Sequence, residues 1–267
     1  MEIDLRKVIN DKNPKLLKLI PRFIISYLER VIHIKELNRF LKENKEKEGL
    51  EFVGAVLEEF GVDIECCGLD NIPKEGRFIF VSNHPLGGLD GLALMYIIGK
   101  LRPDVVFPVN DLLMAVPNLQ SLFIPINKHG SNAQNIKIID NTFAGDDTML
   151  YFPAGLCSRK QSGKIYDLEW KKTFVSKARK HKRDVIPIHV KARNSNFFYN
   201  LANIRKFFGI KANIEMLYLV DEMFKQRNKK MVITIGKPIE YSFFDRSVQN
   251  DRKWATYVKN IVYKLEK

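Results

Sequence analysis

The residue pair best suited to chemistry is His84 and Asp90, which both lie in the segment SNHPLGGLDG that begins at Ser82. A carboxylate beside an imidazole fixes one ring tautomer, and the second ring nitrogen can then take a proton from a hydroxyl group. Gly87 and Gly88 would let the chain turn tightly enough for Asp90 to reach His84, and a bulky substrate could approach their backbone. The pattern indicates a general base, and the alternative is a structural turn with a capping aspartate.

Three further segments end an apolar run with turn-forming, polar or charged residues. FPAGLCSRK, from Phe152 to Lys160, would offer backbone amides, a hydroxyl and two cations to an anionic group. FIPINK, from Phe123 to Lys128, and VIPIH, from Val185 to His189, each carry a proline before a polar residue. Taken singly, these last two segments are better explained as core strands than as sites.

The segments around these residues alternate between strand and helix patterns, which is typical of an α/β fold with a mostly parallel central sheet flanked by helices. His84 falls where a buried strand ends and a helix begins, and open α/β sheets bind their ligands at such places. Expected strands are Val62–Cys67, Phe78–Ser82, Val105–Val109, Leu122–Ile126, Met149–Phe152, Val185–Val190 and Met231–Ile235. Expected helices are Leu89–Leu101, Ala133–Phe143, Asp167–His181, Asn194–Phe208 and Asp251–Leu265.

Helical patterns fill the chain before the first strand. Asn13 and Pro14 resemble an N-cap and a first-turn proline, and Pro21 should kink the amphipathic helix that follows. This cationic helix could lie in a lipid interface, or it could simply pack on its own domain. We therefore expect a helical membrane-docking segment over residues 1–61 and an α/β domain over residues 62–267.

The chain of 267 residues has a formal net charge of +13, which predicts an anionic partner. The region from Ser158 to Arg193 holds most of this excess. We interpret it as an anion-facing surface, with a merely solvated helix face as the alternative. Its densest part comprises Lys171, Lys172, Lys177, Arg179, Lys180, Lys182 and Arg183.

Several classes of protein are disfavoured by missing motifs. Zinc-finger spacing, an aromatic RNA-binding block and a basic-helix motif are absent from the sequence, so no nucleic-acid partner is expected. A GxSxG elbow, a Walker loop and an HExxH metal motif are also absent, so no bound metal is expected. Three cysteines give no disulfide ladder, and the charged N-terminus does not resemble a signal peptide. The apolar run from Phe78 to Gly99 is interrupted by glycines, a proline and Asp90, so a membrane span is not expected.

Taken together and in their order along the chain, in which FIPINK is the second block and FPAGLCSRK the third, the four segments resemble the glycerolipid acyltransferase superfamily, over about residues 78–188. They are most similar to its hemolysin-like branch of ornithine- or glycine-lipid O-acyltransferases, in which the first block reads NHPxGxxDG and the third reads FPAG. The chain departs from the wider family in four ways, of which one is that the basic residue of the third block, Arg159, comes later than usual. Five residues separate His84 from Asp90 instead of four, Ala154 replaces a glutamate, and Asn127-Lys128 replaces an arginine.

The resemblance implies an O-acyltransferase in which His84 deprotonates an acceptor hydroxyl and Asp90 orients the ring. The hydroxyl would attack the thioester of an acyl chain carried by acyl carrier protein or coenzyme A, which is a co-substrate, with no bound cofactor. No covalent acyl-enzyme is needed, although Cys157 is a conceivable nucleophile. Residues expected to bind substrate are Asn83, Gly87, Gly88, Asn127, Lys128, Phe152, Pro153, Gly155, Ser158, Arg159 and Lys160.

The expected acceptor is a lyso-lipid, most simply a monoacylated amino-acid lipid. A 1-acyl-glycerol-3-phosphate acyltransferase of phospholipid synthesis is the alternative, and a non-catalytic lipid-binding relative is a further one. Such an enzyme should bind the membrane surface peripherally, at the cytoplasmic face. An acidic carrier protein, coenzyme A or anionic lipid would each match the basic surface.

Overall fold

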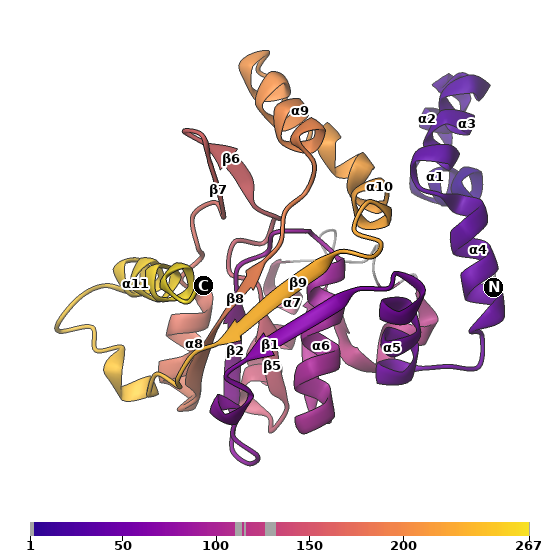
Figure 1. The fold of residues 1–267 in the computed structure, drawn as a ribbon. Coiled ribbons are helices and arrows are strands. Elements are labelled where there is room, and N and C mark those ends of the chain that lie inside the picture. The colour runs from indigo at the N-terminus through magenta and orange to yellow at the C-terminus, as the bar shows by residue number, and fades with distance from the viewer. Residues whose placement is uncertain (1–2, 110–113, 115, 126–131, 267) are drawn as a thin grey trace. The chain divides into compact units, whose positions relative to one another are not determined.

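The strands expected at the centre of the chain form one sheet in the computed structural model, which describes residues 3–109, 114, 116–125 and 132–266. The strands of this sheet are β1 (Asp63–Cys67), β2 (Phe78–Ser82), β3 (Val105–Val109), β4 (Phe123–Pro125), β5 (Thr148–Tyr151), β8 (Asp184–Lys191) and β9 (Lys230–Ile235). Within the described residues their order is β1-β9-β8-β2-β5-β3-β4. All neighbours are parallel except β8 and β9, so the expected mostly parallel sheet is confirmed (Figure 1).

Helices cover both faces of this sheet, which explains why its central strands are apolar runs. The helices α5 (Gly49–Glu59) and α6 (Leu89–Leu101) lie on one side, and α8 (Thr173–His181) and α11 (Asp251–Lys264) lie on the other (Figure 1). Ile79 and Val81 of β2 join a buried cluster that includes side chains of α7 (Asn132–Ala144), α8 and α11. Phe80, between them, is equally buried and points to the opposite face.

The segment between β5 and α8 differs from the expectation. A helix was expected from Asp167, but α8 begins only at Thr173. The preceding residues form a hairpin of β6 (Arg159–Gln161) and β7 (Lys164–Tyr166), which was not expected from the sequence. Ser162 and Gly163 both have positive φ angles and make its tight turn.

The chain divides into two compact units. The first comprises residues 1–47 and 194–227, and the second, which contains the sheet, comprises residues 48–193 and 228–267. Helices of the first unit are α1 (Leu5–Lys12), α2 (Pro14–Leu19), α3 (Arg22–Val31), α4 (Ile34–Glu43), α9 (Asn196–Phe207) and α10 (Leu219–Phe224). The break at Pro21 between α2 and α3 is the one expected from the sequence.

This division differs from the boundary expected at residue 61. Helix α5 belongs to the second unit because it packs closely on α6, with Leu50 against Gly99. Residues 194–227 belong to the first unit, in which the hydroxyls of Tyr27 and Tyr218 are 2.9 Å apart. Over the described residues, no helix combines the length and the apolar character needed to span a bilayer.

Candidate active site

The sheet register brings the first and third sequence blocks together. Strand β2 pairs with β5 so that Val81 lies opposite Tyr151, and both strands end within one residue of these positions. The residues that follow, His84 and Phe152, therefore leave the same edge of the sheet side by side. Their rings are stacked, with centroids 4.0 Å apart and planes inclined by 17°.

His84 and Asp90 form the expected pair. Nδ1 of His84 lies 2.9 Å from Oδ2 of Asp90, whose side chain is fully buried. An ionised carboxylate can only accept, so the ring proton is on Nδ1 and Nε2 is the basic nitrogen. The His84 side chain keeps 15 % of its surface exposed, which leaves room for a substrate to reach the ring.

Asp90 is held by the beginning of α6. Its Oδ2 also accepts the N–H of Leu86 at 3.0 Å, and its Oδ1 accepts the N–H groups of Gly88 and Gly91, each at 3.0 Å. Gly87 makes the intervening turn with a φ of +84°, a conformation that favours glycine. The extra residue between His84 and Asp90, compared with the wider family, is thus accommodated in this turn.

The electrostatics of the pair suit a base. Burial alone would lower the pKa of His84, but the negative charge of Asp90 and its hydrogen bond outweigh burial and raise it. Burial would raise the pKa of Asp90, but the His84 ring and the backbone N–H groups lower it below its usual range. Asp90 is therefore ionised at neutral pH, and its charge would stabilise a protonated His84 ring.

A second carboxylate, Asp167, was not identified from the sequence. Its Oδ1 accepts the backbone N–H of His84 at 3.2 Å and the hydroxyl of Ser158 at 2.6 Å. Its Oδ2 accepts the indole N–H of Trp170 at 2.8 Å, and its own N–H donates to the hydroxyl of Tyr263 at 2.7 Å. Burial raises the pKa of Asp167. The signal in the sequence was a carboxylate three residues before a tryptophan within a basic stretch.

The residues of the third block mostly shape the site. Phe152 is buried against His84, and Phe107 packs edge-on against Phe152 at 5.3 Å. Pro153 is buried, and its carbonyl accepts the N–H of Lys171 at 3.0 Å. Gly155 has a φ of +67° and lies beside the ammonium of Lys171.

Ser158, Arg159 and Lys160 were expected to hold an anionic group. The Ser158 hydroxyl donates to Asp167, so it fixes the loop. The guanidinium of Arg159 is buried and donates to the carbonyl of Cys157 at 2.7 Å. Lys160 stands in the hairpin opposite Ile165 and is half-buried. Their binding of an anion stays a prediction.

The remaining predicted binding residues fall in three places. Both polar atoms of the Asn83 amide bond the backbone of Val190, at 2.9 and 2.7 Å, so this side chain ties β2 to β8. The position of a Cβ on Gly88 would meet no atom within 4 Å, so the chain is open there. Asn127 and Lys128 lie outside the described residues.

Cys157 is poorly suited to be a nucleophile. It is buried, and burial raises the pKa of its thiol to about 11, so the reactive thiolate is scarce at neutral pH. In the described part of the chain, no group of three or more histidine, cysteine or carboxylate side chains could hold a metal ion.

Much of the basic run is neutralised. Lys177, Lys180 and His181 all contact Asp140. Arg183 is completely buried and donates to the carbonyls of Phe143 at 2.7 Å and Asp147 at 2.6 Å. Placing Arg183 on an anion-facing surface was therefore wrong, because its guanidinium satisfies carbonyl groups at the end of α7.

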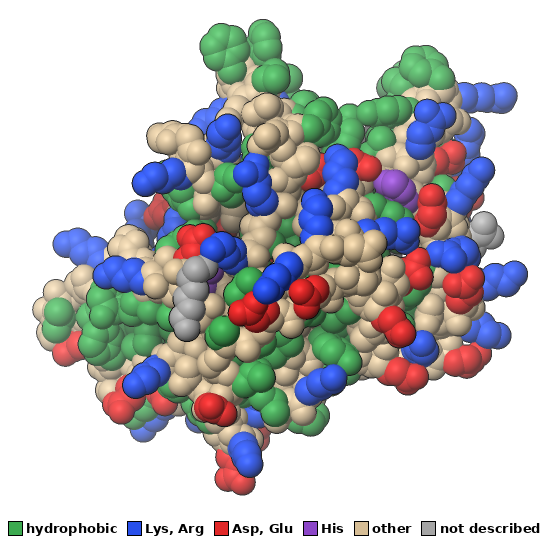
Figure 2. All heavy atoms as spheres, in the orientation of Figure 1, with side chains coloured by type: hydrophobic (Ala, Val, Ile, Leu, Met, Phe, Trp, Pro, Cys, Tyr) green, Lys and Arg blue, Asp and Glu red, His purple; other side chains and the backbone are tan. Residues whose placement is uncertain are grey.

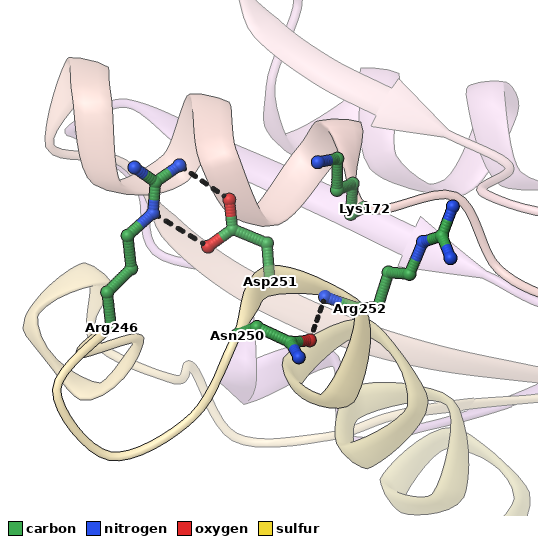
Figure 3. A pocket seen from close by; sticks show the side chains of 5 residues that line it. All are labelled: Lys172, Arg246, Asn250, Asp251 and Arg252. Atoms are coloured by element: carbon green, nitrogen blue, oxygen red, sulfur yellow. Dashed lines mark hydrogen bonds and ion pairs between the residues drawn. The ribbon is translucent and has the colours of Figure 1, made fainter.

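Lys172 of this run lines one hollow of about 300 Å³, together with Arg246 and Arg252 from the C-terminal part of the chain (Figure 3). Arg246 pairs there with the buried carboxylate of Asp251, and Asn250 caps α11. The ammonium of Lys172 and the guanidinium of Arg252 lie on the side away from Arg246 (Figure 3). None of the lining residues belongs to the His84 site, so the hollow is a separate basic surface.

The structure brings the histidine–aspartate pair beside the third block, as the resemblance to acyltransferases implies, and the comparisons show the family. A sequence model of the family described as "Acyltransferase" matches residues 7–267, so this chain belongs to that family.

Two curated relatives are each called lyso-glycine lipid O-acyltransferase, from Bacteroides thetaiotaomicron and Phocaeicola vulgatus. Each is 52 % identical to the chain over 265 residues, which is 98 % of the chain and 97 % or 95 % of the relative. A crystal structure of the 1-acyl-sn-glycerophosphate acyltransferase PlsC from Thermotoga maritima is similar with a TM-score of 0.48 and 19 % identity, over 98 % of each chain.

Proposed function

We propose that this chain is an O-acyltransferase that esterifies the hydroxyl of a lyso-glycine lipid, using a fatty acyl thioester as donor. The observation that carries the proposal is the 2.9 Å contact between Nδ1 of His84 and the buried carboxylate of Asp90. The two relatives with that name are similar to the chain over almost its whole length. That similarity supports the proposed substrate, and the geometry supports the proposed mechanism.

The reaction runs through Nε2 of His84. This nitrogen takes the proton of the acceptor hydroxyl as its oxygen attacks the thioester carbonyl carbon. The C–O bond forms, the tetrahedral intermediate collapses, and the C–S bond breaks. The leaving thiolate recovers the proton from Nε2, so the products are an ester and a thiol. Asp90 stabilises the imidazolium between these two proton transfers, and stacking on Phe152 holds the His84 ring in its orientation.

The acceptor hydroxyl belongs to the lipid chain. Glycine has an amine and a carboxyl group but no hydroxyl, so an O-acylated glycine lipid must carry the accepting hydroxyl on the chain already attached. If that chain is amide-linked, the headgroup presents a carboxylate. Lys160 of the third block, and the exposed Lys171 that lies beside Gly155 of that block, are cations that can meet it.

We also propose that the donor is acyl carrier protein or coenzyme A and that the enzyme works peripherally at the cytoplasmic face of a membrane. A lyso-lipid is delivered from a bilayer, and the exposed Leu19 and Phe23 of α2–α3 stand among cations such as Lys18 and Arg22. The basic hollow beside α8 and α11 would attract an acidic carrier protein or phosphates.

The proposal is tested with purified protein, an acyl thioester and two acceptors, lyso-glycine lipid and 1-acyl-glycerol-3-phosphate. We expect mass spectrometry to show the diacylated glycine lipid and little phosphatidate. In a strain lacking the protein, glycine lipid should disappear while its lyso form accumulates. Preferred acylation of the glycerophosphate would replace the proposed acceptor, and no acylation of either would remove the proposed activity.

A further inference from the structure

The end of α9 exposes an unusual amount of apolar surface. Phe207 and Phe208 keep 85 % and 70 % of their surface exposed, and Ile204 and Ile210 are exposed beside them. Figure 2 shows hydrophobic side chains gathered at this end of the helix. Isolated exposed apolar residues are common, but such a cluster at one helix end marks an interaction site. We call residues 204–211 the α9 tip.

The tip is held in place. After α9 the N–H of Ile210 returns to the carbonyl of Arg205 at 2.9 Å, and Gly209 turns the chain with a φ of +67°. The guanidinium of Arg205 donates to the completely buried carboxylate of Glu215 and to the carbonyl of Ile210 at 3.1 Å. The Phe207 and Phe208 rings pack edge to face at 5.3 Å. Their exposure is thus built into an anchored turn.

The charges beside the tip select its partner. Arg205 forms an ion pair with Glu215, whereas Lys206 and Lys211 are exposed before and after the aromatic pair in the sequence. Aromatic side chains at a projecting turn, flanked by lysines, match the acyl boundary and the anionic headgroups of a bilayer. A protein partner would need a pocket shaped for both aromatic rings, whereas a bilayer surface needs none.

We propose that the α9 tip inserts into the surface of an anionic lipid bilayer and is a membrane contact additional to the N-terminal helices. The inference rests on the proposed function, because an enzyme that acylates a bilayer lipid must meet the bilayer. It adds a contact that lies about 180 residues further along the chain and belongs to the same compact unit as α2–α3.

The first test is binding of the full chain to vesicles of phosphatidylcholine with phosphatidylglycerol, followed by flotation. The double variant Phe207→Ser, Phe208→Ser should have an apparent affinity lower by about tenfold or more, because two large apolar side chains are lost from the interface. The double variant Lys206→Ala, Lys211→Ala should bind these vesicles several-fold more weakly. Its binding to vesicles of pure phosphatidylcholine should be unchanged.

The matched control is the double variant Leu101→Ser, Val248→Ser, which changes two exposed apolar side chains of the second unit. This variant should bind vesicles like the original chain. A loss as large as that of the tip variant would overturn the proposal, and so would unchanged binding of the tip variant.

A direct test places a fluorophore in the tip. Trp170 and Trp254 are buried, so Phe207→Trp adds an exposed indole to a buried background. With vesicles, its emission should shift to the blue and be quenched by brominated acyl chains. An unshifted, unquenched emission would contradict insertion.

Two further measurements separate this proposal from its alternatives. Acyl transfer to lyso-glycine lipid in detergent micelles should be the same for the tip variant and the original chain, because His84 and Asp90 are unchanged. Inactivity of both would remove the proposed function while vesicle binding still tests the tip. If sedimentation shows that the original chain dimerises and the tip variant does not, with equal vesicle binding, the tip contacts a second copy and the proposal is wrong.

Discussion

The backbone N–H of Ser158 donates to the carbonyl of His84 at 2.7 Å, and this bond joins two loops that are far apart in the sequence. Asp167 reinforces the link, since one of its oxygens accepts from both residues. The proposed base, His84, is therefore positioned from two sides. Asp90 fixes its ring, and the loop of Ser158 fixes its backbone.

Replacing His84→Ala should lower kcat by about 10²- to 10⁴-fold, because the acceptor hydroxyl loses its base. The fold should survive, since the ring is partly exposed and its loss leaves Asp90 with three backbone N–H partners. Thioester turnover with lyso-glycine lipid is the measurement, and the circular dichroism spectrum is the control. A variant with unchanged turnover would exclude His84 as the base.

The activity of the original enzyme should fall on acidification, with a midpoint above the ordinary histidine pKa of 6.5. The sign follows from the raised pKa of His84, because only the neutral imidazole accepts a proton and protonation now begins at a higher pH. Replacing Asp90→Asn removes the charge that raises this pKa, so the acid limb of the kcat/KM profile should move to lower pH while kcat drops. An unmoved acid limb would show that another group controls it.

Replacing Asp167→Asn should lower kcat and also move the acid limb to lower pH, because the charge of Asp167 contributes to the raised pKa of His84. Ser158→Ala removes one hydrogen bond to the same carboxylate and should cost about 1 kcal/mol of stability with a smaller effect on kcat. The readouts are the pH profile and the unfolding midpoint in urea. A loss of stability with an unchanged profile would reduce Asp167 to a structural role.

The double variant Lys172→Glu, Arg252→Glu should turn over acyl carrier protein thioester more slowly than the unmodified enzyme at low salt. High salt should diminish this difference in rate. Lys100→Glu changes the charge on α6, on the other side of the sheet, and should have little effect (Figure 1). Comparing initial rates at two ionic strengths tests this. Equal slowing by both variants would indicate a nonspecific charge effect.

Replacing Arg183→Met should destabilise the fold by about 3 kcal/mol, because the carbonyls of Phe143 and Asp147 lose a buried charged donor. Burial lowers the pKa of this guanidinium to about 10, so it stays charged at neutral pH. Urea unfolding measures the change. Unaltered stability with slower donor use would return Arg183 to the surface role first expected for it.

The sequence alone determined the strands of the central sheet and the chemistry of the first block, although it did not predict the β6–β7 hairpin. Buried parallel strands are apolar runs, so Phe78–Ser82 and Val105–Val109 were predicted with their observed bounds. A histidine followed by two glycines and an aspartate predicted the pairing of His84 with Asp90, because the contact is local and needs only a tight turn.

Tertiary structure decided everything that depends on long-range contacts. The role of Asp167 arises from its meeting with His84, 83 positions away, and the burial of Arg183 arises from carbonyls about 40 positions away. Charge composition could not separate Arg183 from the exposed Lys172, because both are basic residues in one run. The exposed end of α9 was likewise invisible in the sequence, because the same aromatic residues in a helix pattern would also suit a core. Which side chains are covered is a property of the packed chain.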